Sequence, residues 1–185
     1  MIIGIDEVGR GCWAGPLVAS AVLLDDMTAI TGLKDSKKLS ERRRNLINED
    51  IQKHAQGIGV GWVDAKEVDA LGLTESVRLA MRRALDQIGY DGVEIIIDGN
   101  YNFLSDIPLT TAVIKADDTI PAVSAASIVA KVARDNYMKE IAMEYPEYSF
   151  EKHVGYGTQL HRNALQAHGV TKIHRLSYKP IKALL

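Results

Sequence analysis

The sequence has little of several features that mark specialised classes of protein. It holds one cysteine, Cys12, in 185 residues, so it forms no internal disulfide and offers no cysteine cluster for zinc. This scarcity favours a reducing, cytoplasmic location. The apolar run over 14–24 is interrupted by Gly15 and Pro16 and is too short for a membrane span, which needs about 20 apolar residues. The first residues have no basic flank, so we expect neither a secretory signal nor a membrane protein.

An excess of charge of one sign is also missing from the chain as a whole. There are 22 Lys and Arg against 24 Asp and Glu, a net charge of −2, which by itself argues against a strongly basic nucleic-acid binder. The distribution is uneven, however, because residues 152–185 contain six bases and no acid. We expect one domain over 1–185 in which 152–185 is a basic C-terminal segment that binds an anionic substrate.

Hydrophobic periodicity predicts an α/β protein. Strands are expected over 2–6, 17–24, 58–63, 93–97 and 110–114, and helices over 41–54, 74–88, 122–145 and 158–168, with a short helix after Asp64. Ser40 is a candidate N-cap, and Asp64 with Glu67 has capping-box spacing. Strands come first in succession and then alternate with helices, which is typical of a mixed central β-sheet flanked by α-helices.

Carboxylates end three of the predicted apolar strands. Asp6 and Glu7 follow the first strand, Asp98 follows the fourth, and Asp117 follows the fifth. Charges at the ends of buried strands are costly unless they are paired or bound to metal, and all-oxygen ligands select Mg²⁺ or Mn²⁺. We therefore expect a two-metal phosphoryl-transfer site. Two alternatives stay open: Asp98 before Gly99 is also a hairpin signal, and Asp117 is also compatible with a loop or a helix cap.

Two glycine-flanked segments complete the candidate site. Gly9, Arg10 and Gly11 directly follow the paired acids, and glycines there let the backbone approach a ligand closely. Tyr156 stands between two glycines, which allows its backbone to come near nucleic acid. A simple turn and a core tyrosine are the alternative interpretations.

At these residues the chain resembles a known family, bacterial ribonuclease HII, over about residues 2–180. The segments that carry the resemblance follow one another in order along the chain: Gly4-Ile5-Asp6-Glu7-Val8-Gly9-Arg10-Gly11, Asp35-Ser36-Lys37-Lys38-Leu39-Ser40, Ile97-Asp98-Gly99-Asn100, Lys115-Ala116-Asp117, Ser124 to Asp135, His153-Val154-Gly155-Tyr156-Gly157-Thr158 and His174-Arg175-Leu176-Ser177-Tyr178-Lys179-Pro180. Two departures are Cys12-Trp13, where an aliphatic pair is expected, and Tyr178, where Phe is commoner.

The resemblance implies a ribonuclease H-like fold with a short C-terminal helical segment. It implies hydrolysis of RNA paired to DNA and incision 5′ to single ribonucleotides embedded in duplex DNA, with 5′-phosphate and 3′-hydroxyl products. The expected roles are removal of ribonucleotides and of RNA primers from DNA. The cofactor implied is Mg²⁺ or Mn²⁺, with two ions during catalysis and Asp6 bridging them. We expect a monomer with no obligate protein partner.

The same resemblance assigns the site residues. The metal-binding and catalytic carboxylates match Asp6, Glu7, Asp98 and Asp117, the loop that senses the 2′-hydroxyl matches Gly9, Arg10 and Gly11, the tyrosine that stacks on the junction sugar matches Tyr156, and Ser36 and Lys37 are expected to contact phosphate. We expect Asp135 to pair with Lys131 rather than to assist the metals. Two other classes remain possible, a DNA junction resolvase of the same superfold and a hybrid-binding protein without catalysis.

Overall fold

A computed structural model of the chain describes residues 1–185 except 26–27, 29, 34–35 and 37–38. The proposed phosphate contact Lys37 therefore lies outside the described residues. Within the described ranges, each helix is too short or too polar to span a membrane.

The described strands form one mixed sheet, as predicted. Its five strands lie in the order β3-β2-β1-β4-β5. The central strand β1 pairs antiparallel with β2 and parallel with β4, and β4 pairs parallel with β5. Because β4 and β5 are parallel, Asp98 and Gly99 do not form the hairpin turn that the sequence left open. The strands are β1 (Ile2–Val8), β2 (Leu17–Leu24), β3 (Gly57–Val63), β4 (Glu94–Asp98) and β5 (Thr110–Val113).

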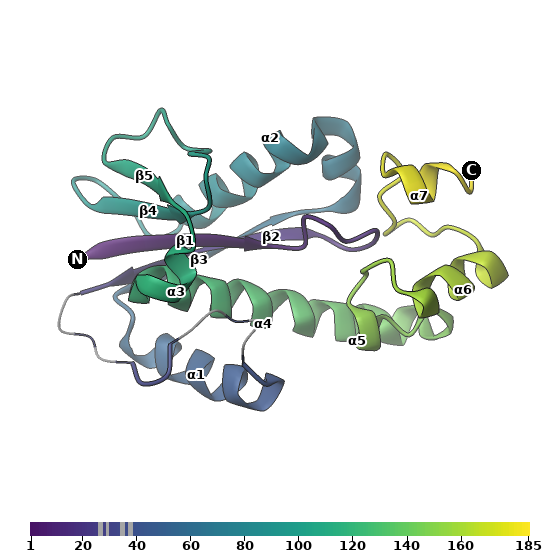
Figure 1. The fold of residues 1–185 in the computed structure, drawn as a ribbon, viewed down its shortest axis with the longest axis horizontal. Coiled ribbons are helices and arrows are strands. Elements are labelled where there is room, and N and C mark those ends of the chain that lie inside the picture. The colour runs from purple at the N-terminus through teal and green to yellow at the C-terminus, as the bar shows by residue number, and fades with distance from the viewer. Residues whose placement is uncertain (26–27, 29, 34–35, 37–38) are drawn as a thin grey trace.

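Helices cover both faces of the sheet (Figure 1). α2 (Ala65–Leu85) lies on one face, and α4 (Pro121–Glu144) lies on the other with α1 (Glu41–His54) packed outside it. The predicted caps form: Ser40 accepts from the backbone of Arg43, and Asp64 closes a capping box with Glu67. The two helices expected after residue 64 are one element with a non-helical residue at Gly72, and it ends at Leu85 rather than at residue 88.

Glycines bring the two long helices unusually close to the sheet. A Cβ on Gly4 of β1 would lie 2.1 Å from the backbone of Ala122 in α4, and a Cβ on Gly61 of β3 would lie 1.9 Å from the carbonyl of Ala80 in α2. Any side chain at these positions would push a helix away from the sheet. The close contact places the start of α4 directly beside β1.

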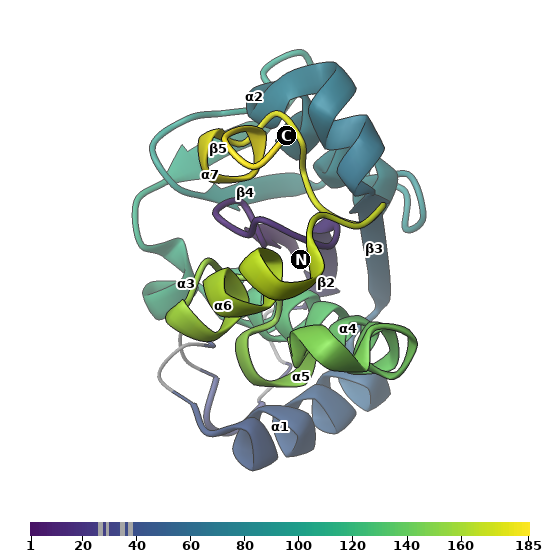
Figure 2. The ribbon, with the colours of Figure 1, turned by 90° about the vertical axis from the view of Figure 1, so that its right-hand side faces the viewer.

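The C-terminal residues form a group of short helices at the end of the sheet where β1 terminates (Figure 2). α6 (Gln159–His168) was predicted, and Thr158 caps it. α7 (Lys179–Lys182) lies in the expected short C-terminal helical segment. The other short elements were not predicted, because three or four residues are too few to establish a helical period. They are η2 (Pro146–Tyr148), α5 (Phe150–His153) and, between β5 and α4, α3 (Ala116–Thr119).

Candidate functional site

Three acidic side chains from separate parts of the chain meet at one edge of the sheet. Asp6 lies in β1, Asp98 ends the neighbouring parallel strand β4, and Asp117 lies in the first turn of α3. Carboxylate oxygens of the three residues all lie within 4.8 Å of one another. Asp6 and Asp117 are buried, at 8% and 7% exposure. The structure thus brings together three of the four carboxylates that the sequence singled out.

Local backbone contacts fix these side chains. Asp98 accepts a hydrogen bond from the backbone N–H of Ala116 at 2.8 Å, and Asp6 accepts one from the N–H of Glu7 at 2.7 Å. Lys115 has a left-handed backbone with φ of 58°, which is uncommon for a residue with a side chain. This conformation turns the chain from β5 into α3 and carries Asp117 to the other two acids.

The environment of Asp6 favours a bound proton or cation. Burial raises its pKa well above the usual value, and the charges of Glu7 and Asp98 raise it further. A hydrogen bond from the hydroxyl of Ser127 acts in the opposite direction. Carboxylate oxygens crowded in this way are the donor set that hard divalent cations prefer. The described residues therefore fit a Mg²⁺ or Mn²⁺ centre.

Glu7 is oriented differently from the other three acids. It is the neighbour of Asp6 on β1, and successive side chains of a strand point to opposite faces. Its carboxylate accepts a hydrogen bond from Arg10 at 3.1 Å. Glu7 is not part of the closely spaced group, although it is near enough to raise the pKa of Asp6.

The glycine loop lies against Tyr156 and directly follows β1, the strand that carries Asp6. Gly9 has a φ of +93°, which a side chain rarely adopts. A Cβ on Gly11 would lie 3.9 Å from the Tyr156 ring, and Tyr156 is 39% exposed. Burial and the neighbouring Cys12 raise the pKa of Tyr156 to about 12, so its hydroxyl stays protonated. The structure brings both predicted elements to one place.

Trp13 packs against the turn that carries Tyr156, at Gly157. A Cβ on Gly157 would lie 2.2 Å from the Trp13 ring, and the backbone N–H of Trp13 donates to the carbonyl of Gly155 at 2.8 Å. The indole therefore packs directly against the turn that carries Tyr156. This departure from the expected aliphatic pair is accommodated by the absence of a side chain at position 157.

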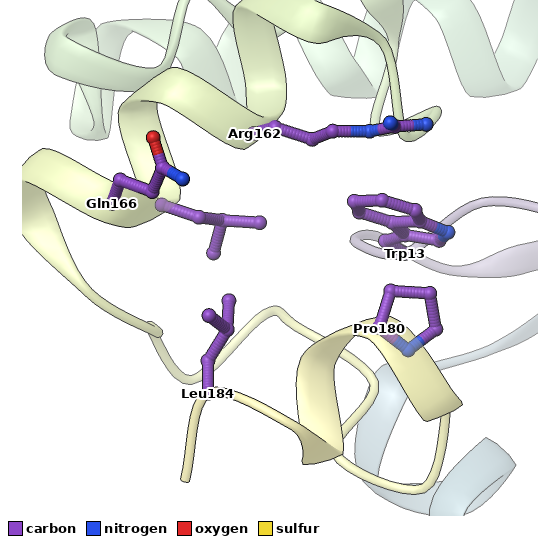
Figure 3. A pocket seen from close by; sticks show the side chains of 6 residues that line it. Trp13, Arg162, Gln166, Pro180 and Leu184 are labelled. Atoms are coloured by element: carbon purple, nitrogen blue, oxygen red, sulfur yellow. The ribbon is translucent and has the colours of Figure 1, made fainter.

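A pocket lies on the far side of Trp13 and is separate from the acids. It has a volume of about 410 Å³, and Figure 3 shows Trp13 between Arg162 and Pro180 with Leu184 across the opening. No carboxylate is among the residues that line it. We therefore place the reaction chemistry at the acids and not in this pocket.

Ser36 is buried and is linked to Asp6 through the hydroxyl of Ser127. It is 3% exposed, and its hydroxyl lies 2.9 Å from that of Ser127, which bonds Asp6. Arg44 donates to the Ser36 carbonyl at 2.7 Å. The contact of Ser36 with phosphate stays a prediction. In this structure the Ser36 side chain faces Ser127.

Asp135 forms the ion pair that the helical spacing indicated. Its carboxylate accepts from Lys131 at 2.7 Å and lies 3.6 Å from Arg44. The contact of Asp135 with Arg44 joins α4 to α1. Among the described residues, Asp135 is not part of the acidic group that fits a metal.

Sequence reasoning missed two buried arginines. Arg134 and Arg175 are both fully buried, and they donate hydrogen bonds to backbone carbonyls of residues 9–16. Each stands in a segment that the resemblance covers. Arginine is almost never fully buried, so nothing in the local pattern of residue types distinguishes these two from exposed arginines.

The comparisons with known proteins agree along the whole chain. The family model that matches is "Ribonuclease HII", over residues 3–181. Ribonuclease HII of Bacillus pumilus is 45% identical over 185 residues, which cover 100% of this chain and 72% of that protein. Ribonuclease HII of a Janthinobacterium strain is 43% identical, covering 100% and 88%.

The fold is shared with solved structures. The crystal structure of ribonuclease H2 from Pyrococcus horikoshii superposes with a TM-score of 0.83 at 25% identity, covering 99% of this chain and 96% of that one. The predicted ribonuclease H-like α/β fold is confirmed. With the family model and the relatives above, this similarity shows that the chain belongs to the ribonuclease HII family of metal-dependent endoribonucleases.

Proposed function

We propose that this chain cuts the RNA strand of RNA–DNA hybrids and incises DNA duplexes on the 5′ side of single embedded ribonucleotides, leaving 5′-phosphate and 3′-hydroxyl ends. Family membership supports action on RNA–DNA hybrids. The observation that carries the finer statement is that the glycine loop, which lies against Tyr156, directly follows the strand that carries Asp6. A nuclease without ribose selectivity needs the first element only.

Asp6, Glu7, Asp98 and Asp117 are the residues that would hold Mg²⁺ or Mn²⁺, with two ions during catalysis. Bound there, divalent ions would lower the pKa of the attacking water and stabilise the leaving 3′-oxygen. The buried position of Asp6 and Asp117 limits the access of bulk water, which strengthens their interaction with a cation. Arg10 donates a hydrogen bond to the carboxylate of Glu7 and would restrict the motion of that side chain.

Recognition of ribose is the proposed role of the loop and the tyrosine. The 2′-hydroxyl distinguishes RNA from DNA at a given site, and backbone groups of Gly9, Arg10 and Gly11 would bond it. The Tyr156 ring would pack on the following sugar, where a deoxyribose lies flush against it. The 39% exposure of Tyr156 leaves one part of its surface open for this contact.

The remaining assignments concern binding of the substrate and its setting. Within a single domain over 1–185, we propose that the basic segment 152–185, with Ser36 and Lys37, contacts phosphates of the duplex. We further propose that the chain acts as a cytoplasmic monomer, without an obligate protein partner, in removal of ribonucleotides and RNA primers from DNA. The net charge of +6 over residues 152–185 supports the proposed contact of this segment with phosphates.

The experiment that tests the proposed function compares two duplexes. The protein is incubated with a duplex that carries one ribonucleotide and with an all-DNA duplex of the same sequence, in Mg²⁺ or Mn²⁺. A nick on the 5′ side of the ribonucleotide and an intact control support the proposal. Equal cutting of both duplexes indicates a DNA nuclease such as a junction resolvase, and binding without cutting indicates a non-catalytic hybrid-binding protein.

A further inference from the structure

Arg175 holds the glycine loop by its backbone carbonyls. The guanidinium is fully buried, and its Nη1 donates to the carbonyl of Gly9 at 2.7 Å and to that of Arg10 at 3.2 Å. Its Nε and Nη2 both donate to the carbonyl of Gly15, at 3.1 and 2.9 Å. One side chain from the far end of the chain thus holds two carbonyls of the loop and one of the segment that follows it.

Tyr178 adds a second donor to the same loop. Its hydroxyl donates to the carbonyl of Arg10 at 2.6 Å and accepts from Arg175 Nη1 at 2.9 Å. A phenylalanine at this position would keep the ring but could not make either bond. Two donors therefore converge on the Arg10 carbonyl, and each also contacts the other.

The turn that carries Arg175 and Tyr178 is itself anchored. Asp69 in α2 accepts from the backbone N–H groups of Leu176 and Ser177, at 2.8 and 2.9 Å. The two donors are therefore fixed relative to the sheet, because α2 packs on β2 and β3. A scaffold of this kind positions a loop more accurately than the loop could by itself.

Holding a carbonyl also orients an N–H. Each peptide unit is planar, and the described peptide bonds are all trans, so its C=O and its N–H point in opposite directions. The carbonyl of Gly9 belongs to the unit that contains the N–H of Arg10, and the carbonyl of Arg10 belongs to the unit that contains the N–H of Gly11. Bonds to these two carbonyls therefore fix the directions of both N–H groups.

Both N–H groups are available to a ligand. Within the described part of the chain, the backbone N–H groups of Arg10 and Gly11 make no hydrogen bond to the protein. They adjoin Tyr156, since a Cβ on Gly11 would lie 3.9 Å from its ring. Two oriented and unused donors at this place match the oxygen of a ribose 2′-hydroxyl, which accepts hydrogen bonds.

The positive charge of Arg175 also strengthens the N–H groups of the loop as hydrogen-bond donors. Among the described residues, it forms no ion pair with a carboxylate, and its hydrogen bonds go to backbone carbonyls and to Tyr178. A buried cation is costly unless its donors are satisfied. Each of those bonds polarises the peptide unit that it touches, which strengthens the N–H on the other side as a donor.

We propose that Arg175 and the hydroxyl of Tyr178 are positioning residues for ribose selectivity, because they orient the N–H groups of Arg10 and Gly11 toward the 2′-hydroxyl. This inference rests on the proposed role of the loop. It extends that role to two residues of the C-terminal segment that do not themselves touch the substrate.

The test uses Tyr178→Phe, which removes one hydroxyl, and Arg175→Lys, which keeps the charge and loses the planar fork. Tyr90→Phe is the matched control, because Tyr90 packs on the same core cluster as Tyr178 at the opposite end of β4. Dissociation constants are measured in chelator, where no cutting occurs, for a duplex with one ribonucleotide and for the all-DNA duplex. The ratio of the two constants is the selectivity, and the melting temperature of each variant reports its folding.

We expect Tyr178→Phe to lower the selectivity about 2- to 10-fold, the loss that one neutral hydrogen bond produces. Arg175→Lys, if it folds, should lower the selectivity further, and Tyr90→Phe should leave it unchanged. If Tyr178→Phe leaves the ratio unchanged, whether both affinities stay the same or both fall equally, the positioning role is overturned. A wild type that neither prefers nor cuts the ribonucleotide duplex indicates instead that the proposed function is wrong.

Discussion

Nε2 of His174 lies 3.0 Å from Nε2 of His161, and both rings are buried. The backbone N–H of Thr171 donates to Nδ1 of His174, so the proton of that ring is on Nε2 and points at His161. His161 in turn donates from Nδ1 to the carbonyl of Tyr156 at 3.0 Å. The two neutral histidines thus form a directed chain of hydrogen bonds that ends on the backbone of Tyr156.

Acid should break this chain. Burial lowers the pKa of His161 and of His174 to about 4, and it also lowers the pKa of the adjacent His153. An unfolded histidine titrates near 6.5, so the unfolded state binds more protons between these values. Stability is then fully present above about pH 6.5 and is lost as the pH falls toward about 4, by on the order of a few kcal/mol.

Urea unfolding between pH 7.5 and 4 measures this loss. His174→Gln should be less stable than the wild type at pH 7.5 and should show a shallower decline toward pH 4. The exposed residue His54 provides the control, and His54→Gln should keep the wild-type slope. A wild-type stability that does not change over this range would contradict the burial of the histidines in their neutral form.

Asp6→Asn should separate stability from activity. The substitution removes a buried negative charge that Glu7 and Asp98 repel, and it keeps the acceptor oxygen for the N–H of Glu7. Without metal, the variant should melt about 2–4 °C higher, the shift that about 1 kcal/mol produces in a chain of this size.

In Mg²⁺ or Mn²⁺, Asp6→Asn should lose more than about 100-fold in cleavage rate, because bound metal contributes several kcal/mol. Added Mn²⁺ should raise the melting temperature of the wild type and not that of the variant. Asp91→Asn, at an exposed acid before β4, should change neither property. Equal stabilisation of all three proteins by Mn²⁺ would argue against a metal centre at Asp6.

Tyr156→Ala should lower cleavage at a single ribonucleotide more than cleavage of a long RNA–DNA hybrid. The reason is that the junction sugar beyond a single ribonucleotide is a deoxyribose, on which the ring is proposed to pack. Tyr156→Phe keeps the ring and should retain most of the activity on both substrates. Initial rates on the two substrates test this, and equal losses in Tyr156→Ala would remove the junction role.

Salt dependence tests the basic segment. If about four phosphates are contacted, the logarithm of the binding constant should fall with the logarithm of salt concentration at a slope near about −3.6. Replacing Lys179 and Lys182 by Ala should make the slope shallower by about 1.8. Lys53→Ala, on the outer helix α1, should leave the slope as it is, and a slope that is the same in all proteins would place the phosphates elsewhere.

Much of the fold follows from the sequence because its elements have strong local signals. Each predicted strand is confirmed to within about two residues at either end, and the cap at Ser40 and the capping box at Asp64 form as expected. The boundary of α2 was harder to predict, because Gly72 interrupts the helical backbone without ending the element. Helices of four residues have no period to read, and they form only when the rest of the protein is in place.

The acids of the candidate site could be predicted because each one follows an apolar strand. The support around them could not be predicted from residue types. The contact of Ser127 with Ser36 spans 91 positions, and the contact of Arg175 with Gly9 spans 166. Such pairs are set by how the elements pack, and a single sequence carries no signal of them.

The most direct measurement is the identity of the ends produced from a duplex with one ribonucleotide in Mg²⁺ or Mn²⁺. A 3′-hydroxyl and a 5′-phosphate on the 5′ side of the ribonucleotide, with no cutting in chelator and none of the all-DNA duplex, is the predicted result. A 2′,3′-cyclic phosphate product, or full activity in chelator, would contradict metal-dependent hydrolysis at Asp6, Glu7, Asp98 and Asp117.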